Sequence, residues 1–222
     1  MRFLPAFLLC AGTALAVGCT KTEDVAPAAV ATAESRVAPA ADEASRLNLN
    51  QDLRSVYRYT VTDISGQRVS LERYRGRKIL IVNTASQCGY TPQYTELQTL
   101  STQYASRVVV LGFPSNDFGG QEPGTDGQIA GFCTGTYHVT FPLFSRVPVV
   151  GATAIPLYRF LGDANRNGVL SDRPSWNFCK YLIDEEGHVV RYFPSAVTPL
   201  DPALLAAILA PAPHPVLAQV QR

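Results

Sequence analysis

The chain has 222 residues, 46% of them hydrophobic, which is enough for one domain with a sizeable core. Its 19 basic and 18 acidic residues leave a net charge of +1, a balance that does not support a nucleic-acid partner. Five cysteines are too few for a small fold built on disulfides, so each cysteine has to be interpreted separately.

The chain begins with a segment that is typical of an export signal. Residues 1–18 carry a basic second residue, an apolar run and small residues at the end, and the run is short for a membrane-spanning helix. The stretch "LAVGC" at 15–19 resembles the lipobox of bacterial lipoproteins, although Ala16 stands where Leu is commoner. We therefore expect a lipid anchor on Cys19, at the periplasmic side of a bacterial membrane. The alternative is an ordinary cleaved signal with a chance cysteine; Cys10 would leave with either signal.

The two ends of the mature chain differ in composition from its middle. Residues 19–52 are rich in Ala, Pro and charge and poor in large apolar side chains, which is typical of a tether. Residues 211–222 are rich in proline and are expected to form a loose tail. The folded domain is therefore expected over residues 53–210.

The first half of this domain shows strand patterns and one helix start. Residues 56–71 alternate between apolar and polar around the turn signal "DISG" and predict a β-hairpin. Continuous apolar runs at 78–83 and 107–113 predict strands that are buried on both faces. Thr91 is expected to cap a helix whose first residue is Pro92.

The second half completes the order of a known type of fold. Helices are predicted at about 125–136, from Pro156, and at 200–210, and residues 177–193 are expected to form two strands joined by a turn. Strand, helix, strand, helix, hairpin and helix is the order of a thioredoxin-like fold. We therefore expect an α/β domain with a central mixed sheet flanked by helices. The opening hairpin and the helix at 125–136 are additions to it.

Cys88 lies just past the end of the predicted strand at 78–83 and before a helix. Reactive residues cluster outside the carboxyl ends of strands in such sheets, and free amides at a helix start stabilise a thiolate. A small buried core residue is the alternative interpretation. "CGYT" lacks the second cysteine of a CxxC motif, and His138, His188 and His214 are scattered, so disulfide exchange and a histidine-activated thiol are weakly supported.

Four blocks of sequence resemble the signature motifs of the glutathione peroxidase family. In chain order they are "NTASQCGYTPQYTELQTL", "GFPSNDFGGQEPG", "FCTGTYHVTFPLF" and "WNFCKYLIDEEGHVVRYFPSAVTP". The resemblance runs from about Val56 to Ile208. It implies a thioredoxin-like fold and a peroxidase that reduces hydrogen peroxide and organic or lipid hydroperoxides with a thiol reductant, without a metal or organic cofactor.

The resemblance also implies a set of site residues. Cys88 matches the peroxidatic position, and Gln121, Trp176 and Asn177 match the family's catalytic partners. Amide and indole N–H groups can stabilise a thiolate without adding charge, and can stabilise the leaving oxygen as the O–O bond breaks. From the residues alone, core packing of the tryptophan and loop capping by the amides would be favoured.

The remaining cysteines separate the subtypes of this family. Thioredoxin-dependent members carry a resolving cysteine ahead of the "TFP" motif, and Cys133 occupies that place. A disulfide needs Cα atoms within about 7 Å, which the family is understood to reach by partly unwinding a helix. Ser115 replaces another cysteine that is common in the family, so Cys133 is the sole resolving candidate; a buried helix residue is the alternative. Cys179 is expected to be a core residue.

The segment at 162–175 is short where tetrameric members carry a longer insertion. The resemblance therefore implies a monomer that uses a thioredoxin-like reductant, with glutathione as the other possible reductant. Two alternatives stay open. One is a redox or copper-handling lipoprotein without peroxidase activity, in which Cys88, Cys133 and His138 would converge. The other is a surface lipoprotein with vestigial catalytic residues.

Overall fold

The computed structural model describes residues 53–211. The expected signal segment, Cys19 and the tether up to residue 52 lie outside the described residues, as does the expected tail from residue 212. Within the described part of the chain, no helix combines the length and the apolar character that crossing a membrane requires.

A four-stranded mixed sheet lies at the centre of the domain. In spatial order its strands are β4 (Val108–Pro114), β3 (Lys78–Thr84), β5 (Lys180–Ile183) and β6 (Val189–Phe193). β3 and β4 are parallel, with Ile81 opposite Leu111, whereas β5 is antiparallel to both β3 and β6. Every residue of β3 and β4 is buried, which explains the two continuous apolar runs in the sequence.

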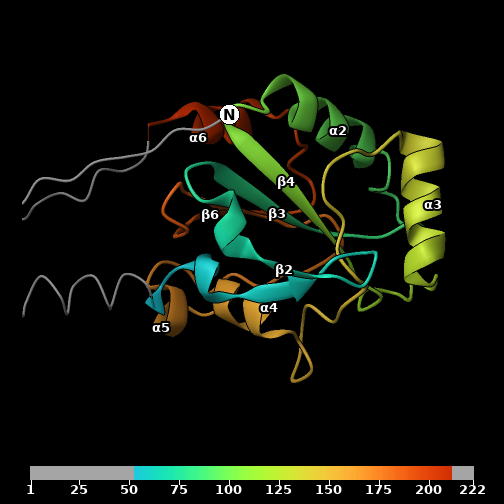
Figure 1. Cartoon of the computed structure of the whole chain (residues 1–222), viewed down its shortest axis with the longest axis horizontal. Helices are drawn as coiled ribbons and strands as arrows, with labels where there is room; N and C mark the ends of the chain where they lie inside the picture. The colour runs from blue at the N-terminus through green and yellow to red at the C-terminus, as the bar shows by residue number, and fades with distance from the viewer. Residues whose placement is uncertain (1–52, 212–222) are drawn as a thin grey trace, which may run out of the picture. The chain divides into compact units, whose positions relative to one another are not determined.

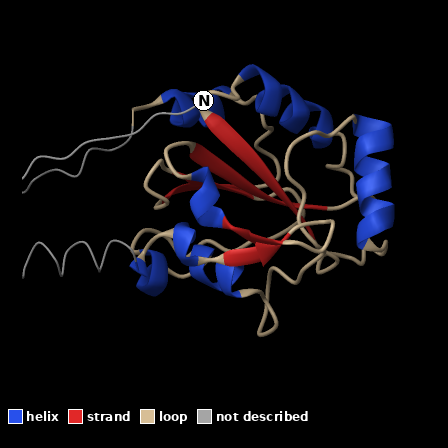
Figure 2. Cartoon of the chain, in the orientation of Figure 1, coloured by secondary structure: helices blue, strands red, loops and turns tan. Residues whose placement is uncertain are grey.

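Helices cover both faces of this sheet. They are α2 (Gln93–Gln103), α3 (Asp126–Tyr137), α4 (Pro156–Leu161), α5 (Ala164–Asn167) and α6 (Pro202–Leu209). Figure 1 shows α2 and α6 on one side of the strands and α4 and α5 on the other, with α3 standing beside them. Figure 2 shows the strands of the central sheet with helices around them. The expected thioredoxin-like α/β fold is confirmed.

The expected hairpin is present but shorter than the alternating pattern. Its strands and the 3₁₀ helices that flank them are β1 (Thr60–Thr62), β2 (Arg68–Ser70), η1 (Val56–Arg58) and η2 (Leu71–Tyr74). The Asp63 carboxylate accepts the backbone N–H groups of Ser65 and Gln67, both at 2.9 Å, which closes the turn.

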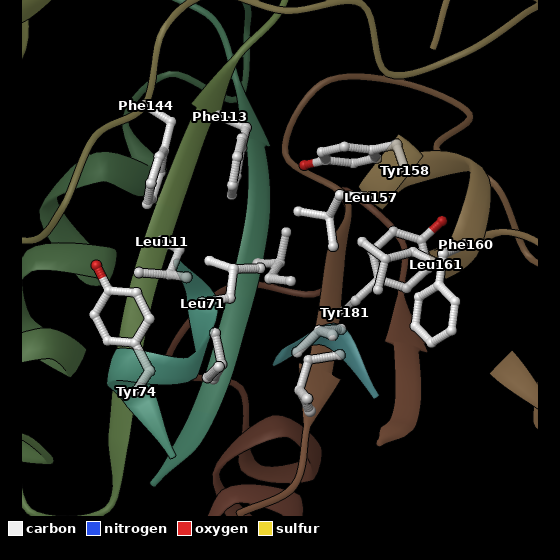
Figure 3. Close-up of a cluster of buried hydrophobic side chains, with 14 of the residues drawn as sticks. Leu71, Tyr74, Leu111, Phe113, Phe144, Leu157, Tyr158, Phe160, Leu161 and Tyr181 are labelled. Carbon is white, nitrogen blue, oxygen red and sulfur yellow. The ribbon is translucent and has the colours of Figure 1, made fainter. Parts of the chain in front are cut away.

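The side chains of alternate β3 residues point into two hydrophobic cores, one on each face of the sheet. Ile79 and Ile81 point into the core beneath the hairpin and α4. There the rings of Phe113 and Phe144 stack with centroids 4.5 Å apart (Figure 3). Leu80 and Val82 point into the opposite core, which includes residues of α2, α3 and α6. Cys88 and Cys133 both belong to this second core, so they share one face of the domain.

Candidate active site

Cys88 lies in the loop between β3 and α2, at the carboxyl end of β3, and is 8% exposed. Its backbone N–H donates to the Thr91 hydroxyl oxygen at 3.0 Å, and that hydroxyl donates to the Ala85 carbonyl at 2.9 Å. The Tyr90 N–H points at the Cys88 sulfur from 3.4 Å. The turn that carries the thiol is thus closed by a side chain, with one amide donor directed at the sulfur.

The expectation that Thr91 caps α2 is wrong. The helix begins at Gln93, and Pro92 precedes it without a side-chain hydrogen bond to the first turn. The Thr91 hydroxyl is hydrogen-bonded to the Cys88 N–H and the Ala85 carbonyl, so it does not cap the first turn of the helix. Thr91 therefore belongs to the candidate site, where it holds the Cys88 turn, and not to the cap of α2 that the sequence pattern predicted.

The loop after β4 brings Gln121 to the Cys88 loop. Gly119 and Gly120 have φ angles of 65° and 66°, which L-residues rarely adopt, and they turn the chain back toward β3. The Gln121 carbonyl then accepts the N–H of Gln87, the residue before Cys88, at 3.0 Å. Backbone pairing thus places Gln121 next to the thiol-bearing loop.

Trp176 and Asn177 reach Gln121 from the segment that precedes β5. The Asn177 Nδ2 donates to the Gln121 Oε1 at 2.9 Å. The Trp176 ring packs against Phe118 with centroids 5.8 Å apart and remains 39% exposed. A Cβ placed on Gly119 would lie 3.6 Å from the Gln121 side chain and 3.7 Å from the Trp176 ring. The structure therefore gathers Gln121, Trp176 and Asn177 from distant parts of the chain.

The amide pair leaves hydrogen-bonding capacity unused. Asn177 is fully buried, and its Oδ1 has no hydrogen-bond partner among the described residues. The bond to Asn177 engages the oxygen of the Gln121 amide, so the Gln121 NH₂ group remains for another acceptor. Buried polar atoms are normally paired, so an unpaired one on Asn177, which bonds Gln121, suits a group that a substrate or an intermediate would engage.

Cys133 lies inside the continuous helix α3 and is fully buried. Burial raises the pKa of the Cys133 thiol to about 11; the nearby Tyr94 hydroxyl lowers this pKa and Glu122 raises it further. Cys88, Cys133 and Cys179 are all free thiols in this structure. The described state is therefore a reduced one, with Cys133 protonated and enclosed.

A cavity of about 450 Å³ lies between the Cys88 loop and the start of α3. Its lining residues are Ser86, Gln87, Glu122, Pro123, Gly124, Gln128, Ile129 and Phe132. Glu122 is 1% exposed, its Oε2 has no hydrogen-bond partner among the described residues, and burial raises its pKa. The space between the segment that carries Cys88 and the helix that carries Cys133 is thus partly open and contains a weakly solvated carboxyl group.

Cys179 is fully buried, as expected, but its surroundings are polar. The hydroxyl oxygens of Tyr192 and Ser195 lie 3.0 and 3.4 Å from its sulfur. Burial raises the pKa of Cys179, but hydrogen bonds from Ser195 and Tyr192 outweigh it and leave the pKa below its ordinary value. Burial also lowers the pKa of the adjacent Lys180 to about 8. The apolar pattern of this strand did not reveal these polar contacts.

The convergence of Cys88, Cys133 and His138 that a copper site would need is not present. Within residues 53–211, no group of three or more His, Cys, Asp or Glu side chains is placed to hold a metal ion.

Known proteins match both the sequence and this structure. The model of the glutathione peroxidase family matches residues 56–162. The glutathione peroxidase homolog BsaA of Staphylococcus epidermidis is 45% identical over 142 residues, which cover 64% of this chain and 89% of that protein. The hydroperoxy fatty acid reductase of Synechocystis is 44% identical over 151 residues, which cover 65% of this chain and 89% of that protein.

A solved structure gives the same result for the fold. The crystal structure of Trgpx in its apo form is 36% identical and superimposes with a TM-score of 0.54, covering 72% of this chain and 98% of that one. The order of the strands, the motifs around Cys88 and these relatives agree. The chain belongs to the glutathione peroxidase family of oxidoreductases.

Proposed function

We propose that the protein is a thiol-dependent peroxidase in which Cys88 reduces hydrogen peroxide and organic or lipid hydroperoxides. The observation that carries this proposal is the bond from Asn177 to Gln121, at 2.9 Å, directly beside the Cys88 loop. This bond keeps two uncharged amides together, next to the segment that precedes Cys88. The relative from Synechocystis, a hydroperoxy fatty acid reductase, supports the choice of substrate class.

In the first step, the Cys88 thiolate attacks the outer oxygen of the hydroperoxide. An S–O bond forms as the O–O bond breaks, so the sulfur is oxidised to a sulfenic acid and the leaving oxygen takes up a proton as water or alcohol. The N–H donors of Gln121, Asn177 and Trp176 stabilise the negative charge that develops on the leaving oxygen.

In the second step, the Cys133 sulfur attacks the Cys88 sulfenic acid. An S–S bond forms and water leaves. Because Cys133 is fully buried in α3, this step requires local opening of the helix. A thioredoxin-like dithiol then reduces the disulfide and is itself oxidised to a disulfide. Glutathione is the alternative reductant, and it would act on the sulfenic acid directly.

Peroxide consumption by three forms of the protein tests these steps. The wild type should turn over with hydrogen peroxide and a fatty acid hydroperoxide when a thioredoxin system supplies electrons. Cys88→Ser should be inactive although folded, because a hydroxyl is a far poorer nucleophile than a thiolate. Cys133→Ser should consume one equivalent and then stall. Normal turnover of folded Cys88→Ser would overturn the proposal, and normal turnover of Cys133→Ser with thioredoxin would leave Cys133 as a packing residue.

The same proposal includes a location. The segment that ends in "LAVGC" supports export followed by lipidation of Cys19, which would hold a monomeric peroxidase at the periplasmic side of a bacterial membrane. A peroxidase tethered there would meet hydroperoxides that form in lipids.

A further inference from the structure

Asn83, the residue before the last of β3, is a fully buried amide with a partner for each of its side-chain atoms. Its Nδ2 donates to the carbonyl of Trp176 at 2.9 Å, and its Oδ1 accepts the N–H of Cys179 at 3.1 Å. A carbonyl can only accept and an N–H can only donate, so these two contacts fix the orientation of the amide. One side chain thus grips both ends of the segment from 176 to 179.

The backbone of Asn83 holds the same segment. Its N–H donates to the Cys179 carbonyl at 3.3 Å, and its carbonyl accepts the N–H of Phe178 at 2.6 Å. These bonds continue the β3–β5 ladder, which in the strands proper ends with Val82 opposite Lys180. All the hydrogen-bonding groups of Asn83 are therefore directed at the segment that carries two of the proposed catalytic residues.

This segment needs such support because its backbone is strained. Phe178 has a φ of 63°, in the left-handed region that bulky L-residues rarely occupy. A residue persists in that region only where its surroundings over-determine it. The Phe178 ring is fully buried and meets Tyr94 edge-on, with centroids 5.4 Å apart. The turn at Phe178 takes the chain out of the line of β5, so that Trp176 packs on Phe118 and Asn177 reaches Gln121.

Asn83 also lies five residues before Cys88 on the strand that leads to the thiol. We propose that Asn83 is a positioning residue for the peroxidase reaction, which fixes Trp176 and Asn177 relative to the Cys88 loop through its four contacts to the 176–179 segment. This inference rests on the proposed function of Cys88. A displacement of about 1 Å in a catalytic group can cost about 10²-fold in rate, so loss of this grip should slow the oxidation of Cys88.

Two substitutions remove the grip to different extents. Asn83→Asp keeps the acceptor for the Cys179 N–H but sets a carboxylate oxygen against the Trp176 carbonyl. Asn83→Ser is smaller and uncharged, and it cannot make both contacts at once. The matched control is Asn167→Asp. Asn167 is another buried asparagine, and its amide bonds the backbone of Phe160, Leu161, Val169 and Leu170 on the far side of the sheet.

Trp176 supplies a readout that does not depend on activity, because it is the only tryptophan of the chain. Its emission maximum and its quenching by acrylamide report the packing of the indole on Phe118. The rate of Cys88 oxidation by hydrogen peroxide is measured separately by stopped flow. Thermal unfolding of each variant supplies its stability, and all measurements are made well below the unfolding transition.

We expect Asn83→Asp to lower the rate constant of Cys88 oxidation by about 10²-fold and to change the emission of Trp176, with a smaller effect for Asn83→Ser. Asn167→Asp should lose stability but keep both the rate constant and the emission. The inference is overturned if a folded Asn83 variant keeps the wild-type rate and emission, or if Asn167→Asp slows the reaction equally. If wild-type Cys88 does not react with hydroperoxide, the proposed function fails, whereas unchanged emission in the Asn83 variants would show that Asn83 does not hold the segment.

Discussion

The Thr91 hydroxyl satisfies two backbone groups of the thiol-bearing turn at once, the N–H of Cys88 and the carbonyl of Ala85. Both groups are buried, so without this hydroxyl they would be left unpaired in a region with little access to water. The position of the Cys88 sulfur thus depends on a residue outside the set that we propose to act on the peroxide.

Thr91→Val should therefore lower the free energy of unfolding by about 1–3 kcal/mol and slow the oxidation of Cys88, although valine has nearly the same shape. Thr91→Ser, which keeps the hydroxyl, should retain most of the rate. Urea unfolding and stopped-flow oxidation measure the two effects. A valine variant that loses stability but oxidises at the wild-type rate would contradict a role for this turn in reactivity.

The amide donors can be tested in the same way. Gln121→Ala and Asn177→Ala should each slow sulfenic acid formation by about 10²–10³-fold, since each removes a donor to the transition state. Gln98→Ala is a suitable control, because this glutamine bonds Thr140 through both amide atoms but lies outside the site. If Gln121→Ala and Asn177→Ala form the sulfenic acid as fast as the control Gln98→Ala, the two residues have a structural role only.

The protonation of Cys133 predicts the pH dependence of the second step. Burial raises the pKa of this thiol to about 11, so the thiolate fraction grows with pH well beyond neutrality. If α3 opens and closes faster than the disulfide forms, the closed state sets the protonation of Cys133, and we expect the rate of Cys88–Cys133 disulfide formation to rise about tenfold per pH unit from about pH 7 to about pH 10. Quenched samples analysed by mass spectrometry would show the loss of two hydrogens. Levelling near pH 8.5, roughly the pKa of a free thiol, would contradict this.

Among the elements, α3 combines a capped start with Cys133, which the proposed disulfide step requires to move. Thr125 and Gln128 form a capping box, in which the Gln128 side chain accepts the Thr125 N–H at 2.9 Å and the Thr125 hydroxyl accepts the Gln128 N–H at 3.4 Å. The helix ends at Tyr137, and the next residue, His138, caps it with a φ of 54° in the left-handed region. Both ends of α3 are thus closed, and opening the helix costs free energy.

Thr125→Ala should weaken α3 by about 1 kcal/mol and thereby raise the rate of disulfide formation about fivefold, if opening precedes the reaction of Cys133. Amide exchange around residue 133 should accelerate in parallel. Asp201→Ala is the control, since it removes a comparable cap, at 2.7 Å from the Ala203 N–H, from the helix α6, which carries no cysteine. Faster exchange with an unchanged rate of disulfide formation would show that opening of α3 does not limit this step.

The elements with strong local patterns were predictable, whereas the contacts across the sheet were not. The apolar runs of β3 and β4, and the helix expected at about 125–136, match the structure within one or two residues. The hydrogen bond from Asn83 to the Trp176 carbonyl and the bond between the Thr91 hydroxyl and the Cys88 N–H join groups that only the fold brings together. No local sequence signal therefore predicts them. The family motifs led to the proposed site residues, whereas the contacts that hold them are visible only in the folded structure.

At the scale of the whole molecule, one buried cation joins three segments around the site. The Lys180 ammonium donates to the Gln93 side chain at 2.6 Å and to the carbonyls of Phe178 and Val197 at 2.9 and 2.5 Å. Gln93 begins α2, directly after the Cys88 loop, and Phe178 follows the proposed donors. The apolar pattern of this strand did not predict the role of Lys180. Its contacts link the start of α2, which follows the Cys88 loop, to the segment that carries Trp176 and Asn177.

The proposed anchor also belongs to this scale. Wild-type protein expressed in a bacterial host should fractionate with membranes, and its mature N-terminus should be a lipid-modified Cys19 by mass spectrometry. Cys19→Ala should be released into the periplasm or stay unprocessed, because no acyl chain then adds membrane affinity. A wild type that is recovered as soluble protein and begins at another residue would refute the anchor and leave the peroxidase proposal intact.

The contacts that assemble the site span long stretches of the chain: Asn177 and Gln121 are 56 residues apart, and Asn83 and Trp176 are 93 apart. Such pairings form late in folding, because the entropy of closing a long loop must be overcome first. While the chain is being synthesised, Cys88 emerges before Gln121, Trp176 and Asn177, which we propose to be its donors. On that proposal, Cys88 becomes reactive toward peroxide only when β5 has joined the sheet, so a partly folded chain would be less easily oxidised at this thiol.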